Sequence, residues 1–142
     1  MLTQDSILLP GKDAQESNQK TLFVIDWEAC ELGNRAQDLG QMIAEMWKLS
    51  LCGGVDSGRW LLRGFMDGYG ALEDELAFRT AIAIGTHLIA FAPFGNEAGQ
   101  LGPPEVVESS VRVGKDVIVN AWNKNRAWFE DDDLKCLFSS DP

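Results

Sequence analysis

Basic residues and histidine are scarce in this chain. Its 142 residues include 12 Lys and Arg against 22 Asp and Glu, a formal net charge of -10, and a single His. A nucleic-acid-binding protein neutralises phosphates with Lys and Arg, so this balance argues against nucleic acid as the partner. It argues equally against an anionic membrane surface. A cationic small molecule or a metal ion suits such a charge, although an acidic charge also serves simply to keep a protein in solution.

Cysteine and long apolar runs are also in short supply. The three cysteines, Cys30, Cys52 and Cys136, form no Cys-x-x-Cys or Cys/His cluster, which gives no sign of a zinc site and indicates a reduced compartment. The longest apolar candidate, residues 80–94, is interrupted by His87 and is shorter than a membrane span of roughly 20 residues. The N-terminus lacks the basic start and apolar core of a signal peptide. We therefore expect a cytoplasmic protein that does not enter the membrane.

Apolar residues, in contrast, make up 45% of the chain, which is enough to bury a core. We expect a single domain over residues 1–142. Two short apolar runs, Ile7-Leu8-Leu9 and residues 21–25 (TLFVI), flank a polar loop and predict a β-hairpin over about residues 5–25. An isolated hairpin is marginally stable in water, so it must pack on another part of the protein.

The following residues, about 34–129, have the periodicity of four helices. The first runs from Asn34 to about Leu51, and the third, over 73–91, is apolar almost all round and therefore central. The second begins near Asp56, and its expected buried side comprises Trp60, Leu61, Phe65, Met66 and Tyr69. The fourth begins at Pro103-Pro104. Its expected apolar stripe comprises Val107, Val111, Gly114, Ile118, Trp122 and Asn125, widened by Val106, Val113, Val117 and Ala121.

The last residues, 130–142, include the run Asp131-Asp132-Asp133, which sits where the helix dipole disfavours acids. We expect this acidic tail to be a frayed, solvated end. The predicted fold class is mainly α (α+β), a short N-terminal β-hairpin followed by about four helices.

Two carboxylates directly after the second apolar run are the candidates for chemistry. Asp26 and Glu28 flank Trp27 at the expected end of a strand, where a rigid backbone would hold a carboxylate in place. Hard oxygen ligands on a fixed element are what Mg²⁺ requires. From the spacing alone, the alternative is that Asp26 caps a turn and Glu28 is solvated.

The stretch 24–47, VIDWEACELGNRAQDLGQMIAEMW, resembles a segment of the aminoglycoside phosphotransferase and choline kinase group of protein-kinase-like enzymes. That segment follows the catalytic loop and typically shows Ile-Asp-Trp-Glu and then Asp-Leu. The later stretches resemble, less specifically, the helical lobe of fungal-type members; they are GFMDGYG, AFRTAIAIGTHLIAF and RVGKDVIVNAWNKNRAWF. With them, the resemblance to the family covers roughly residues 5–138. The resemblance implies the C-terminal lobe of a protein-kinase-like fold, with Asp26 as a metal ligand and Asp38 as a brace for the catalytic loop.

The same resemblance implies that much of the active site is missing. The catalytic Asp of the family would fall at Met1, and its metal-holding Asn at Ser6, whose hydroxyl is a poorer ligand. A Gly-rich phosphate loop and a strand-borne Lys are absent. We therefore expect a truncated or inactive form, with no catalytic residue of its own, of a phosphotransferase that uses ATP and Mg²⁺ on a hydroxyl of a small molecule, a cationic acceptor being one option. On its own the chain would then need no cofactor; a non-catalytic binding or interaction module is the alternative.

Three further expectations concern packing. His87 is expected to be a core or lobe-interface histidine with a partner. Trp122 and Trp128 could wall a pocket, and simple packing is the alternative. Loss of the nucleotide-binding lobe would leave an apolar patch, so we expect self-association through the exposed lobe interface.

Overall fold

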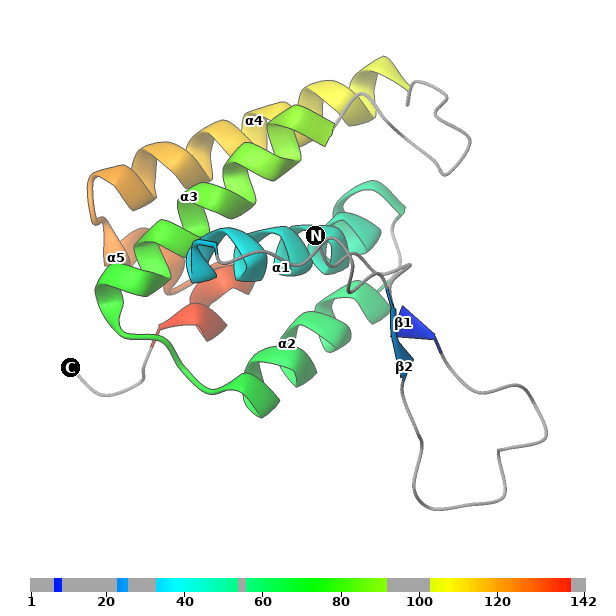
Figure 1. Cartoon of the computed structure of the whole chain (residues 1–142). Helices are drawn as coiled ribbons and strands as arrows, with labels where there is room; N and C mark the ends of the chain where they lie inside the picture. The colour runs from blue at the N-terminus through cyan, green and yellow to red at the C-terminus, as the bar shows by residue number, and fades with distance from the viewer. Residues whose placement is uncertain (1–6, 9–22, 26–32, 54–55, 92–102, 139–142) are drawn as a thin grey trace.

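The computed structural model describes residues 7–8, 23–25, 33–53, 56–91 and 103–138, and this part of the chain is mainly helical (Figure 1). Strand β1 (Ile7–Leu8) pairs antiparallel with β2 (Phe23–Val24). The loop between them and the ends of the predicted 5–25 hairpin lie outside the described residues, so the complete hairpin stays a prediction.

Each segment with helical periodicity forms a helix, which confirms the mainly helical class. The helices are α1 (Arg35–Gly53), α2 (Ser57–Tyr69), α3 (Asp74–Phe91), α4 (Pro104–Trp122) and α5 (Arg126–Phe129), followed by a 3-10 helix, η4 (Asp133–Leu137). None of these described helices combines the length and the apolar character needed to cross a membrane.

Local sequence signals explain where the helices begin and end. The Asn34 side chain caps α1, because its Oδ1 accepts a hydrogen bond from the Ala36 N–H at 3.0 Å. Pro104 occupies the first turn of α4, where its missing N–H costs nothing. Gly70 ends α2 at φ +95°, a conformation that a side chain disfavours, and its N–H bonds the Met66 carbonyl at 2.8 Å.

Helix α3 lies between α1 and α4 (Figure 1), as its all-round apolar character predicts. Small residues allow these helices to approach closely. A Cβ on Gly85 would lie 2.5 Å from the Gly114 carbonyl oxygen, and a Cβ on Gly40 would lie 2.5 Å from Cβ of Ala83. The crossing points of both helix pairs are therefore set by glycines.

The core fills the space between α1, α2, α3 and the C-terminal segment. Phe78, Phe129 and Phe138 pack with ring centroids 5.0–6.2 Å apart, mostly edge to face. The largest fully buried side chains are Phe129, Ile43, Leu62, Ile84, Leu88, Leu134, Leu137, Val117 and Thr80. The methionines Met42, Met46 and Met66 are buried as well and belong to the core.

The prediction of a solvated acidic tail is wrong for residues 133–138. Leu134 and Leu137 of η4 are fully buried, and the Leu72 N–H donates to the Leu137 carbonyl at 3.0 Å. The Asp132 carboxylate caps η4 by accepting from the Leu134 N–H at 2.9 Å. Burial of a leucine side chain contributes about 1.5–3 kcal/mol, more than the acids at this helix end cost. The remaining residues, 139–142, lie outside the described part.

The predicted buried side of α2 is largely wrong. Trp60, Leu61 and Tyr69 are 75%, 50% and 41% exposed, whereas Gly58, Leu62 and Met66 are buried. A Cβ on Gly58 would lie 2.6 Å from the Met46 carbonyl oxygen. Close approach to α1 at this glycine turns Leu62 and Met66 inward and the larger aromatic residues outward.

The predicted apolar face of α4 is confirmed for Gly114, Val117 and Ala121, which are buried, and is wrong for Val111 and Trp122, which are exposed. Its buried residues are Ser110, Gly114, Val117 and Ala121, while Trp122 is 76% exposed. Small residues face α3 because Gly114 meets Gly85 there. Periodicity alone predicted burial of large side chains such as Trp122, which instead lie to the side of the contact between α4 and α3.

Candidate functional site

The predicted metal ligand lies outside the described residues. Asp26, its neighbour Glu28 and Ser6 all fall in segments of which the structure describes nothing. Asp38 is described, and it lies exposed in the first turn of α1. Within the described residues, no group of three or more His, Cys, Asp or Glu side chains could hold a metal ion. The magnesium site therefore stays a prediction.

The described part contains a cleft of about 570 Å³ along the contact of α1 with α3, here called the α1–α3 cleft. Its lining comes from α1 and the preceding residue, from one face of α3, and from the end of α4. These residues are Asn34, Ala36, Gln37, Gln41, Arg79, Ile82, Ala83, Thr86, His87, Phe91 and Trp122.

The two ends of the cleft differ in chemistry. Helices α1 and α3 run in the same direction, because Gly40 lies against Ala83 and Glu45 bonds His87 further along both helices. The end of α4 lies near the start of α3, where Lys124 pairs with Glu75 at 2.8 Å. Arg79 and Trp122 therefore belong to one end of the cleft, and His87 belongs to the other.

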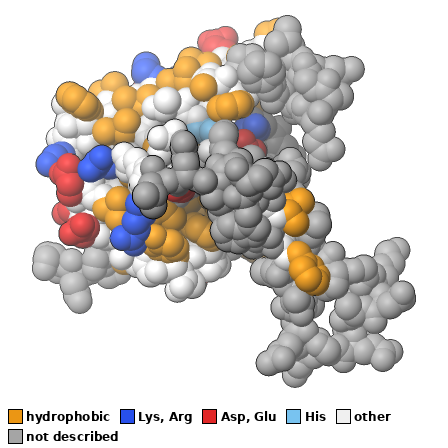
Figure 2. All heavy atoms as spheres, in the orientation of Figure 1, with side chains coloured by type: hydrophobic (Ala, Val, Ile, Leu, Met, Phe, Trp, Pro, Cys, Tyr) orange, Lys and Arg blue, Asp and Glu red, His pale blue; other side chains and the backbone are white. Residues whose placement is uncertain are grey.

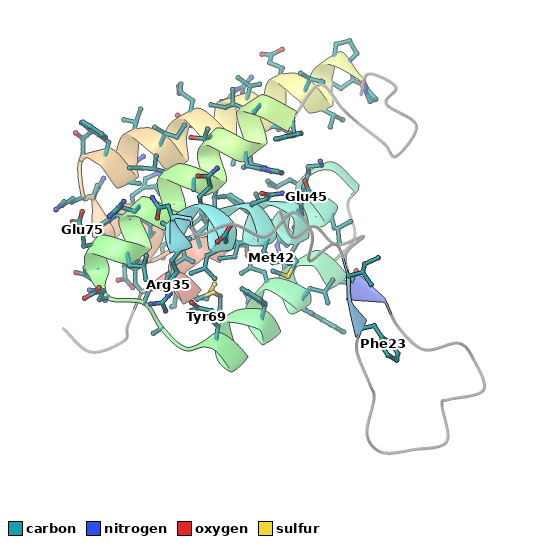
Figure 3. The ribbon with its side chains drawn as sticks, viewed as in Figure 1. Phe23, Arg35, Met42, Glu45, Tyr69 and Glu75 are labelled. Atoms are coloured by element: carbon teal, nitrogen blue, oxygen red, sulfur yellow. The ribbon has the colours of Figure 1, made fainter. Side chains whose placement is uncertain are left out.

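At the second end, His87 joins α3 to α1. Its Nε2 lies 2.6 Å from Oε1 of Glu45, which is on the side of α1 that faces α3 (Figure 3). The hydrogen bond with His87 lowers the pKa of Glu45, burial opposes this, and Lys48, whose Nζ is 3.5 Å from the same oxygen, adds to the lowering. The His87 ring also stacks on Phe91 at 4.4 Å between centroids. The expectation of a buried, partnered histidine is confirmed, and His87 contributes to the cleft wall as well.

In the middle of the cleft, Gln41 is a polar residue without a partner among the described residues. Its side chain is 8% exposed, and its Nε2 makes no hydrogen bond. The other polar groups of the wall are engaged, since Asn34 caps α1 and the Thr86 hydroxyl donates to the Ile82 carbonyl at 2.8 Å. Buried polar groups are nearly always hydrogen-bonded, so the Gln41 amide calls for an explanation.

At the first end, Arg79 is exposed and takes part in none of the ion pairs among the described residues, although its charge contributes to lowering the pKa of Glu75. Trp122 is 76% exposed beside it. The described lining contains no carboxylate, so its charge at this end is positive. In Figure 2 acidic and basic side chains gather at this same end of the molecule, where α5 and the start of α3 lie, the region of the Arg126–Asp74 and Lys124–Glu75 pairs.

A second cleft, of about 660 Å³, lies between α2 and the C-terminal segment but offers little chemistry. Its wall includes Arg63, Asp131, Asp132 and Cys136. Burial raises the pKa of Asp132, and it raises the pKa of the Cys136 thiol to about 11. The thiol is protonated at neutral pH and is therefore a poor nucleophile.

Sequence reasoning identified part of the α1–α3 cleft. It proposed Trp122 as a pocket wall, and the structure places it there, whereas Trp128 packs against the core. It did not single out Gln41 or Arg79. The available signal was a polar residue, Gln41, inside the apolar face that runs through Leu39, Met42 and Ile43.

The chain is similar to a protein from Cladobotryum sp named phosphotransferase FrzJ. The two are 27% identical over 128 residues, which are 89% of this chain and 32% of that protein. The chain thus spans about a third of the length of the curated relative that it matches. No family model matches the chain, and no solved structure matches it.

Proposed function

We propose that this chain is the C-terminal helical lobe of a phosphotransferase that uses ATP and Mg²⁺ to phosphorylate a hydroxyl of a small molecule. The observation that carries the proposal is the similarity to FrzJ, which covers 89% of this chain but 32% of that phosphotransferase. The resemblance of residues 24–47 to the aminoglycoside phosphotransferase and choline kinase group supports the same conclusion, as does the mainly helical fold. The hairpin over about residues 5–25 would then be the strand pair that leads to the metal ligand.

Each part of the chain has a role in this proposal. Asp26 would hold Mg²⁺, which neutralises phosphate charge during phosphoryl transfer. Asp38 would brace the catalytic loop from the first turn of α1. The α1–α3 cleft would hold the acceptor, since positioning of the attacking hydroxyl is most of what such an enzyme supplies beyond charge neutralisation.

The isolated chain is expected to be inactive, because the catalytic Asp and the nucleotide-binding residues have no counterpart in it. A coupled assay of ATP consumption by the purified chain, with Mg²⁺ and a panel of hydroxyl compounds, tests this. Activity above the protein-free rate would contradict the inactive-lobe proposal.

The metal site is tested separately by a Mg²⁺ titration followed by NMR. Asp26→Ala should abolish the shifts, because it removes the proposed ligand. Asp56→Ala is the matched control, since Asp56 is an exposed carboxylate at the start of α2 whose side chain makes no capping hydrogen bond. Equal shifts in the parent and in Asp26→Ala would remove the metal site from the proposal.

A non-catalytic binding module is the second candidate function. It is favoured by the way the described helices close a core of their own, with Phe129, Leu134 and Leu137 sealing the end of the bundle. The two candidates share the α1–α3 cleft and differ in whether Asp26 binds Mg²⁺.

A further inference from the structure

We propose that the α1–α3 cleft binds a hydroxylated aromatic carboxylate, with the carboxylate on Arg79, the ring against Trp122 and a ligand oxygen on the amide of Gln41. The inference rests on the proposed function only for the ligand's role as phosphoryl acceptor. Binding itself follows from the described lining.

Arg79 determines the charge of the ligand. It is the exposed cation of the cleft wall, it makes no ion pair with described residues, and no carboxylate accompanies it in the described lining. The nearby carboxylate on which its charge acts, Glu75, lies outside this lining and is paired with Lys124 at 2.8 Å. A guanidinium matches a carboxylate in a planar, two-bonded geometry. The net charge of -10 over the whole chain acts over longer distances, and at physiological salt charges more than about 8 Å away are largely screened. The charge of the described lining therefore favours an anion here.

Gln41 indicates where a ligand oxygen would lie. Its Nε2 is buried without a hydrogen-bond partner, and its side chain forms part of the cleft wall. The terminal amide torsion of glutamine is soft, so the amide can turn its N–H groups toward an acceptor in the cleft. A ligand oxygen would satisfy a donor that the chain itself leaves unpaired.

Trp122 and the apolar floor indicate a ring. The indole is 76% exposed although tryptophan is usually well buried, and it lies at the same end of the cleft as Arg79. Ile82 and Ala83 supply apolar surface to the wall of the same cleft. Small-molecule sites typically combine such an apolar wall with a few polar groups that fix orientation.

Three probes of one shape test the charge preference: 4-hydroxyphenylacetate, 4-hydroxyphenylacetamide and tyramine. They share the ring and the hydroxyl but carry a negative charge, no charge and a positive charge. Each is titrated into the full chain without ATP and followed by amide NMR shifts. We expect the carboxylate to bind several-fold more tightly than the amide and the amide more tightly than tyramine, with shifts at Gln41, Ala83 and Trp122.

Variants then assign the contacts. Arg79→Gln should remove the preference for the carboxylate over the amide, a factor of up to about five for an exposed pair, and Arg63→Gln, on the exposed side of α2, should leave it unchanged. Gln41→Met should weaken all three probes while raising the melting temperature of the free chain, because the buried amide is replaced by an apolar side chain of similar length. Weaker binding together with a higher melting temperature would show that Gln41→Met removes a contact with the ligand and leaves the fold intact.

Two results would overturn the proposal. One is tighter binding of tyramine than of 4-hydroxyphenylacetate, which is what the cationic acceptor expected from the overall charge predicts. The other is the absence of shifts in the cleft with any of the probes. Because these titrations contain no ATP, either failure leaves the phosphotransferase proposal standing, and failure of the ATP assay leaves the binding result standing.

Discussion

Nε2 of His87 on α3 lies 2.6 Å from Oε1 of Glu45 on α1, and this hydrogen bond ties two long helices together beside the α1–α3 cleft. The pKa of Glu45 is lowered from its ordinary value of 4.5, chiefly by the bond to His87. The folded chain therefore holds the ionised carboxylate more strongly than the unfolded chain does. The resulting stabilisation is complete above the ordinary pKa and is lost as the pH falls through the lowered one.

Glu45→Gln should reduce the free energy of unfolding by about 1.5–3 kcal/mol at pH 7, the usual range for a hydrogen bond with a charged partner. The deficit relative to the parent should shrink as the pH falls below 4.5, because the parent then loses the same interaction. Urea unfolding at neutral and acid pH measures both effects. Glu108→Gln is the control, since its pair with Arg112 is exposed on both sides; a deficit for Glu45→Gln that does not depend on pH would contradict this account.

Gly85→Ala should destabilise the chain by about 1–3 kcal/mol, the typical cost of overpacking. A Cβ there would lie 2.5 Å from the Gly114 carbonyl oxygen, so α3 and α4 would have to separate. Gly64→Ala, in α2 with no atom within 4 Å of the new Cβ, is the matched control. It should stabilise the chain by up to about 1 kcal/mol through helix propensity. Chemical denaturation measures the free energy of unfolding of both variants. Equal changes in the two would show that the close contact of α3 with α4 is absent.

Thr80→Val should raise the stability. The Thr80 hydroxyl is fully buried in α3 and has no hydrogen-bond partner among the described residues. An unsatisfied buried group costs about 1–3 kcal/mol, and valine has nearly the same shape. Thr86→Val is the control, because that hydroxyl is exposed and already bonds the Ile82 carbonyl. A lower melting temperature for Thr80→Val than for the parent would show that the hydroxyl has a partner in solution.

The isolated chain should self-associate through the outer face of α2. Trp60 and Leu61 are 75% and 50% exposed, and adjacent large apolar side chains of this kind mark contact surfaces. The double variant Trp60→Ser, Leu61→Ser should lower the apparent mass in light scattering at micromolar concentrations. Trp122→Ser, which removes an equally exposed indole from α4, should not. A parent chain that is already a monodisperse monomer would count against the prediction.

The positions of the four long helices were predictable from the sequence. The break between α4 and α5, the 3-10 helix η4 and several of the faces that pack were not. Asn34, Pro104 and Gly70 carry local signals that act within one helix, so the helix bounds followed from them. The buried faces of α2 and α4 depend on Gly58 and Gly114, whose importance arises from a backbone on another helix. Periodicity favours large apolar residues and therefore pointed to Trp60 and Trp122.

The candidate site divides in the same way. Trp122 was identified from the sequence as a candidate pocket wall, with simple packing as the alternative, and periodicity alone could not decide between the two. The role of Gln41 was not, since an unpaired amide is recognised only from the atoms around it. The prediction of a solvated acidic tail failed for a related reason. The acidic charges are visible in the local sequence, but Leu134, Leu137 and Phe138 are buried by residues of α2 and α3 that are distant in sequence.

The central claim is that this chain is one lobe of a phosphotransferase whose metal ligand is Asp26. The most direct measurement is acceptor-dependent ATP consumption by the product of the reading frame extended upstream of Met1, compared with the same protein carrying Asp26→Asn. We expect Mg²⁺-dependent transfer to a hydroxyl compound in the former. In the latter, we expect a loss of about 100-fold or more, because metal stabilisation of transferring phosphate contributes several kcal/mol. Transfer that survives Asp26→Asn undiminished, or an extended protein without acceptor-dependent ATP consumption, would contradict the claim.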